Sequence, residues 1–159
     1  MPRVVFMCGP AGAGKSTTAS QFERSGMVRL SFDQEAWSRG YRSMPLPDHS
    51  HRDIETHLRR RLIDLVGTGH DVVLDFSFWS RAMRDDWRVL LTPRGIVAET
   101  IYLATPRQTC LDRIALRASD HADGFVGEIT DPVHLTTRDD AVMAASEPIQ
   151  GWIAARQHT

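Results

Sequence analysis

Short apolar runs alternate along the chain with segments in which apolar residues recur at helical spacing. The runs at 4–7, 27–32, 71–76 and 96–103 predict four β-strands, because each is short and is bounded by glycine or polar residues. The run at 71–76 has a continuous apolar middle, which is typical of a strand buried on both faces of a parallel sheet.

The segments between these runs predict helices. In 49–66, Ile54, Leu58 and Leu62 recur at helical spacing, whereas charged residues take the other side. Beyond 118 the periodicity fails, and polar residues with glycines at 119–131 favour a loop. One or two short helices are expected after it, with no clear fifth strand. The other expected helices cover 17–22, 34–38, 80–91 and 105–118.

A glycine-rich segment follows the first predicted strand and opens the first helix. It has the form G-x-x-x-x-G-K-S, whose backbone N–H groups and helix N-terminus suit a phosphate. Within it, the lysine is expected at the β- and γ-phosphates and the serine at Mg²⁺. The alternative is a turn that binds nothing. The expected nucleotide contacts are Gly9, Pro10, Ala11, Gly12, Ala13, Gly14, Lys15, Ser16 and Thr17.

This order of elements predicts an α/β fold of the three-layer P-loop NTPase type. We expect a mostly parallel sheet of four or five strands with helices on both faces, and a short lid at about 118–132. Ligands of such sheets bind beyond the carboxyl ends of the strands, so residues at those ends are informative.

Two aspartates come at predicted strand ends. Asp75 follows the third strand and resembles a Walker B carboxylate that holds Mg²⁺. Asp33 follows the second strand, where a base would take the proton of an attacking hydroxyl and contact the acceptor. The alternative for both is an N-cap of the next helix.

Several arginines are candidates for binding phosphate or acceptor. Arg113 and Arg117 share one face of the helix that leads into the expected lid, where cations would offset charge on a transferring phosphate. The alternative is a solvated basic stripe. Arg81 and Arg84 follow Asp75 and would contact an anionic or polar acceptor, with a surface position as the alternative. The weaker candidates are Arg39 and Arg42.

Composition limits the class of protein. The 159 residues include 42% hydrophobic and 25% charged residues and predict a single globular domain, 1–159. The formal charge of −1 argues against a generally basic surface, and so against nucleic acid as a partner, though not against a local basic site. Without a signal-peptide layout or an apolar run of membrane-spanning length, we expect a cytoplasmic protein with no membrane contact. Oligomeric state is not readable from the sequence.

The segments GPAGAGKS, LSFDQ, VVLDFSFWSR and LDRIALR together resemble the small P-loop kinases related to phage polynucleotide kinase, zeta toxins and chloramphenicol phosphotransferase. Such bacterial proteins are often labelled AAA-family ATP-binding proteins. The resemblance covers residues 1 to about 118 and implies that Asp33 is the general base. It also implies that Arg113 and Arg117 form the lid pair, with Arg117 at the transferring phosphate, and that Asp75 and Arg81 contact acceptor or metal.

These observations predict an ATP- and Mg²⁺-dependent kinase that phosphorylates a hydroxyl of a small molecule. Its catalytic residues would be Lys15, Asp33 and Arg117, its metal ligands Ser16 and Asp75. The acceptor itself is not readable. The alternatives are an NTPase, for which the guanine-selective N-K-x-D motif is absent, and a regulatory or toxin-like module that binds ATP without transferring phosphate.

Overall fold

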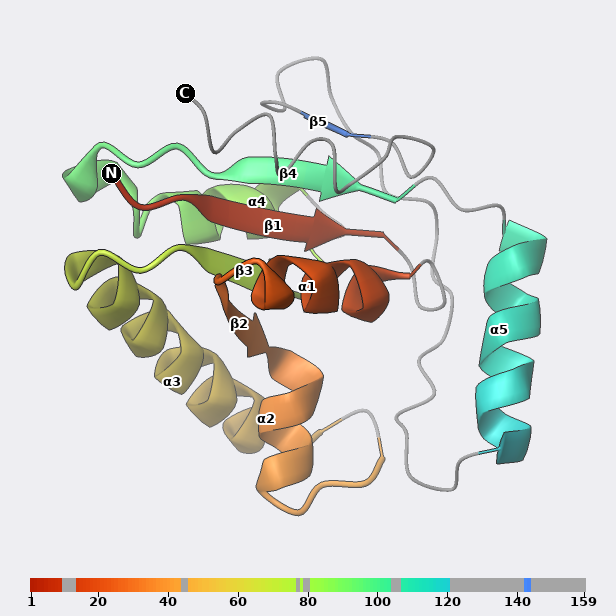
Figure 1. The fold of residues 1–159 in the computed structure, drawn as a ribbon. Helices are drawn as coiled ribbons and strands as arrows, with labels where there is room; N and C mark the ends of the chain where they lie inside the picture. The colour runs from red at the N-terminus through yellow and green to blue at the C-terminus, as the bar shows by residue number, and fades with distance from the viewer. Residues whose placement is uncertain are drawn as a thin grey trace.

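The structure, a computed structural model, describes residues 1–9, 14–43, 46–76, 78, 81–103, 107–120 and 142–143. Strands and helices alternate along most of this length (Figure 1). The strands are β1 (Val4–Cys8), β2 (Val28–Ser31), β3 (Val72–Asp75), β4 (Glu99–Tyr102) and β5 (Val142–Met143). The helices are α1 (Lys15–Arg24), α2 (Phe32–Ser38), α3 (Asp48–Gly67), α4 (Arg81–Arg88), the 3₁₀ turn η1 (Thr92–Arg94) and α5 (Arg107–Asp120).

The strands form one parallel sheet in the order β2-β3-β1-β4-β5. The central strand β1 is buried along its whole length, as its unbroken apolar sequence predicts. Because all of the strand pairings are parallel, the carboxyl ends of the strands lie at the same edge of the sheet. The α/β class and the mostly parallel sheet are therefore confirmed.

Helices cover both faces of this sheet, because alternate residues of β1 point in opposite directions. Phe6 lies in one core with Ile54 of α3 and Trp87 of α4. Met7 lies in a second core, which includes Phe22 of α1. The layers are visible in Figure 1, where α1 crosses in front of the sheet and α4 lies behind it. The three-layer arrangement follows from two separate apolar cores.

Several predicted boundaries change. A fifth strand exists, since Val142 pairs with Thr100 of β4, and the expectation of no clear fifth strand was wrong. A strand of only two residues lacks the length that an apolar run needs to be recognised.

β2 ends at Ser31, and α5 continues to Asp120, past the expected loop start at 119. The helix expected at 80–91 is α4 followed by η1. The expected lid beyond Asp120 lies outside the described residues.

Among the described helices, none is long and apolar enough to cross a membrane.

Candidate active site

Adjacent strands bring two of the predicted site segments to one edge of the sheet. Ser31, the last residue of β2, is the register partner of Asp75, the last residue of β3. Asp33 follows in the first turn of α2. Cys8 ends β1 next to β3 and leads into the glycine-rich loop. The geometry thus gathers the loop and both aspartates at the carboxyl edge of the sheet.

Lys15 contacts Gly9, the first residue of the glycine-rich motif. Its Nζ donates a hydrogen bond of 2.8 Å to the carbonyl oxygen of Gly9. Gly14 is the N-cap of α1 with φ 100°, a left-handed conformation that side chains disfavour. The positive end of a helix dipole and the N–H groups of its first turn favour negative charge, so the start of α1 suits an anion. The predicted contacts at 10–13 lie outside the described residues. Thr17 lies exposed in the first turn of α1.

The two predicted metal ligands meet. Ser16 Oγ donates a hydrogen bond of 3.1 Å to Asp75 Oδ2. Two oxygens on neighbouring corners of an octahedral Mg²⁺ shell lie about 3 Å apart, because each is about 2.1 Å from the ion. The spacing and the oxygen chemistry of this pair therefore fit Mg²⁺. Asp75 is not an N-cap as the alternative proposed, because α4 begins only at Arg81.

Arg29 joins this pair, and sequence reasoning missed it. Its Nη2 lies 2.6 Å from Asp75 Oδ2, and its Nη1 donates to Ser20 Oγ at 3.2 Å. The Arg29 and Asp75 side chains are only 10% and 4% exposed. An arginine inside a predicted strand carries no local signal of such a partner. Only the neighbouring position of β2 and β3 brings the two side chains together.

Arg113 reaches the glycine-rich loop from α5. Its Nη1 lies 3.6 Å from the position that a Cβ on Gly14 would take. This distance sets a cationic group beside the N-terminus of α1. Arg117 lies one turn further along α5, and its side chain is outside the described part of the structure.

Asp33 is held in a short helix rather than capping one. Ser31 is the N-cap of α2, and its side chain accepts the hydrogen bond of Gln34 N at 3.2 Å. The N-cap alternative for Asp33 was therefore wrong. Asp33 is exposed in the first helical turn, where the helix dipole favours a negative charge.

Aromatic and charged side chains surround the start of α2 and α3. Phe32 contacts the ring of His51 with 4.7 Å between centroids. His51 lines an open cavity of about 250 Å³ together with Asp48 and Arg52. This hollow of mixed charge therefore adjoins the helical turn that carries the predicted base.

Arg42 and Arg39 make contacts with residues close to them in the sequence. The Arg42 guanidinium lies 3.7 Å from the centroid of the Trp37 ring, and its Nη1 donates to the Trp37 carbonyl at 2.8 Å. Arg39 pairs with Glu35 of the same helix at 3.0 Å. Nothing in these contacts brings Arg42 to the Ser16–Asp75 pair.

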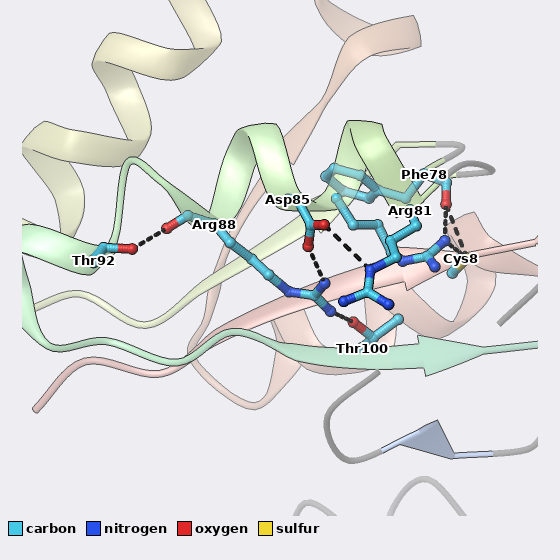
Figure 2. A network of polar contacts seen from close by, with 8 residues as sticks. Cys8, Phe78, Arg81, Asp85, Arg88, Thr92 and Thr100 are labelled. Atoms are coloured by element: carbon cyan, nitrogen blue, oxygen red, sulfur yellow. Dashed lines mark hydrogen bonds and ion pairs between the residues drawn. The ribbon is translucent and has the colours of Figure 1, made fainter. Parts of the chain in front are cut away.

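Arg81 belongs to a polar network along α4 (Figure 2). Its Nε donates to Asp85 Oδ2 at 3.3 Å, and Arg88 donates to the other Asp85 oxygen at 3.0 Å and to Thr100 Oγ1 of β4 at 3.0 Å. Desolvation by burial raises the pKa of Asp85. The hydrogen bonds from Arg88 and Arg81 outweigh this effect, so that the pKa of Asp85 lies below its ordinary value. The network fixes one side of the Arg81 guanidinium.

Arg84 is the largest completely buried side chain among the described residues. Its Nη1 donates to the Phe78 carbonyl oxygen at 3.0 Å, and Cys8 Sγ donates to the same oxygen at 3.1 Å. Figure 2 shows Cys8 and Phe78 facing each other at this point. Arg84 thus lies inside the protein, and the alternative that placed it at the surface was wrong. An acceptor in solvent has no access to its side chain.

Comparisons with known proteins bear on the family and the fold. The family model described as AAA domain matches residues 4–130. APS kinase CysC of Mycobacterium tuberculosis, solved with AMPPNP and APS, has 18% identity and a TM-score of 0.70, over 99% of this chain and 96% of that one. A putative kinase from Chloroflexus aurantiacus has 13% identity and a TM-score of 0.75, over 99% and 98% of the two chains.

A gluconokinase from Sinorhizobium meliloti has 16% identity and a TM-score of 0.60, over 96% of this chain and 88% of its own. No curated protein matches the chain. At these identities the structural likeness establishes the fold. Since the family match spans most of the 159 residues, the chain belongs to the AAA domain family and has the fold of the small P-loop kinases.

Proposed function

We propose that this protein is a phosphotransferase that moves the γ-phosphate of ATP to a hydroxyl of a small molecule. The observation that carries the proposal is the 3.1 Å hydrogen bond between Ser16 Oγ and Asp75 Oδ2. It joins the serine of the phosphate motif to a strand-end carboxylate, which is the pairing that a Mg²⁺·ATP site of this class requires. The kinases among the structures with the same fold support the reaction class.

The donor half of the site uses the start of α1. Lys15 and the backbone N–H groups of the loop bind the phosphates, and Arg113 adds positive charge beside Gly14. Arg117 is proposed at the transferring phosphate. Ser16 and Asp75 would hold Mg²⁺, which neutralises charge on the phosphate oxygens when bound. These groups orient the γ-phosphate and stabilise the charge that develops on it.

The acceptor half is proposed around α2. Asp33 accepts the proton of the acceptor hydroxyl as that oxygen attacks the γ-phosphorus, and the bond to the β,γ-bridging oxygen breaks to release ADP. The cavity lined by Asp48, His51 and Arg52 adjoins this turn and offers a polar wall for the acceptor. Arg42 and Arg81 are proposed to contact the acceptor at the edges of the site.

The test separates ATP binding from transfer. Wild type and Asp33→Asn are incubated with ATP, MgCl₂ and fractionated metabolite pools, and ADP release is measured. Asp33→Asn is expected to bind ATP with unchanged affinity while losing at least about a hundredfold in transfer, the scale of general-base catalysis. Asp53→Asn, a change at an exposed aspartate of α3, serves as the matched control with wild-type transfer.

The outcomes distinguish the functions. ATP consumption that requires an acceptor supports the kinase. Acceptor-independent hydrolysis supports an NTPase. ATP binding without either reaction supports a regulatory or toxin-like module. Retained transfer in Asp33→Asn removes that residue from its role as base.

A further inference from the structure

Arg29 adds a charge to the Ser16–Asp75 pair that the proposed function does not use. Its Nη2 lies 2.6 Å from Asp75 Oδ2, the same oxygen that accepts the Ser16 hydrogen bond. Because both charged side chains are at least nine-tenths buried, salt and water screen their attraction little. The charge of the carboxylate is therefore already balanced by a cation of the chain itself.

The guanidinium is held from a second side. Arg29 Nη1 donates to Ser20 Oγ at 3.2 Å, and Ser20 Oγ in turn donates to the Ser16 carbonyl oxygen at 2.8 Å. The Arg29 backbone is fixed by its register with Val73 in β3. Leaving the site would break contacts to both β3 and α1. Arg29 is therefore a fixed part of the site.

This fixed cation opposes a divalent metal. A metal held by Ser16 Oγ and Asp75 Oδ2 would lie within a few ångströms of the guanidinium, where like charges repel strongly in a partly buried site. Lys15, at the neighbouring position of α1, adds a second positive charge. The phosphates of a nucleotide would supply the negative charge that offsets the positive charges of the metal, Arg29 and Lys15.

From this arrangement we propose that Arg29 is an internal counter-charge that prevents Mg²⁺ from binding until the phosphates of ATP arrive. The inference rests on the proposed role of Asp75 as metal ligand. It makes metal binding conditional on nucleotide, so that the pair Ser16–Asp75 recognises the Mg²⁺·ATP complex rather than the free ion. Arg29 acts here through Asp75 and is a positioning residue.

The test measures Mg²⁺ binding in the absence of nucleotide. MgCl₂ alone is titrated into wild type and Arg29→Gln, with thermal unfolding and calorimetry as readouts. Glutamine removes the charge but keeps an amide that hydrogen bonds to the carboxylate. The variant is expected to bind Mg²⁺ at least about tenfold more tightly than wild type, with a matching rise in melting temperature on MgCl₂ addition.

Two further variants show whether the tighter Mg²⁺ binding depends on the charge of residue 29 and on Asp75. Arg29→Lys keeps the positive charge and is expected to bind free Mg²⁺ as weakly as wild type. The double variant Arg29→Gln with Asp75→Asn is expected to lose the gain, which locates the metal at Asp75. A gain that survives in the double variant places the ion elsewhere and overturns the proposal, as does unchanged or weaker Mg²⁺ binding by folded Arg29→Gln.

Wild type alone provides a measurement that does not depend on the folding of variants. Titrated with MgCl₂ in the absence of nucleotide, wild type is expected to show no rise in melting temperature, because the carboxylate is already balanced by Arg29. Tight binding of free Mg²⁺ by wild type contradicts the counter-charge. Failure of the proposed function is a different result, namely no phosphate transfer to any acceptor, and it leaves the metal titrations interpretable.

Discussion

The hydroxyl of Ser16 and the carboxylate of Asp75 meet where α1 begins and β3 ends, with 3.1 Å between Oγ and Oδ2. One residue belongs to the glycine-rich motif, and the other ends an apolar strand. The same carboxylate oxygen also pairs with Arg29. One carboxylate oxygen therefore connects the start of α1 to the pairing of β2 with β3.

Asp75→Asn is expected to destabilise the fold as well as the site. The substitution leaves the Arg29 charge buried without its counter-ion, a loss of about 3–5 kcal/mol for a buried pair. Chemical denaturation measures the free energy of unfolding. Asp86→Asn is the control, because its pair with Arg59 is exposed on the Asp86 side and is expected to contribute less than about 1 kcal/mol. Equal effects of the two changes would contradict the buried-pair argument.

Gly14→Ala is expected to cost about 1–2 kcal/mol of stability and to weaken ATP binding. Among the described atoms outside its chain neighbours, none comes closer than 3.6 Å to a Cβ at Gly14, so the penalty is expected from the left-handed backbone with φ of +100°. Gly67→Ala in α3 is the matched control, because it has no positive φ and open space around it. There alanine is expected to stabilise the helix by about 0.5–1 kcal/mol. Denaturation and nucleotide titration check both variants.

Ser31→Ala is expected to remove the cap of α2 and to loosen the turn that carries Asp33. Loss of an N-cap hydrogen bond costs about 1 kcal/mol. If Asp33 is the base, turnover falls while ATP affinity stays at the wild-type value, since the donor half of the site is untouched. Ser38→Ala, at the other end of the same helix, is the control for both measurements. A change in ATP affinity alone would argue against this role of the cap.

Arg84→Lys and Arg81→Lys compare a buried and a half-exposed arginine on one helix. The Arg84 side chain is wholly buried and donates to the Phe78 carbonyl, so lysine there is expected to cost about 1–3 kcal/mol of stability. Arg81, at 40% exposure, is expected to change stability by no more than about 0.5 kcal/mol and to alter the KM for the acceptor instead. Stability curves and acceptor kinetics separate the two effects. A stable Arg84→Lys would contradict the assigned contact.

Acid is expected to weaken the network on α4. Hydrogen bonds from Arg88 and Arg81 prevail over desolvation and lower the pKa of Asp85, so its folded-state pKa is below the unfolded value. Its stabilising contribution is therefore present above the unfolded pKa and is lost as the pH falls through the folded pKa. Asp85→Asn should flatten this part of the stability curve, measured by thermal unfolding from neutral to acidic pH. An unchanged pH dependence would remove Asp85 as its source.

The sequence alone determined the local elements and the glycine-rich motif of this protein. Four apolar runs were enough to predict β1 to β4, because buried parallel strands need continuous apolar residues. The glycine-rich motif and Asp75 were recognised because their spacing and strand context are local properties. Those properties also led to the fold of the small P-loop kinases and to the AAA domain family, which the comparisons confirm.

Only the tertiary structure decided which residues are neighbours. The strand order brings Arg29 into contact with Asp75, and the packing of α4 buries Arg84. In the sequence, Arg29 and Arg84 both look like ordinary polar positions. Strand pairing also revealed β5, which is too short to form a pattern. The physical reason is that periodicity reports how much of a residue is buried, whereas the partner of a buried charge depends on contacts between segments far apart in the chain.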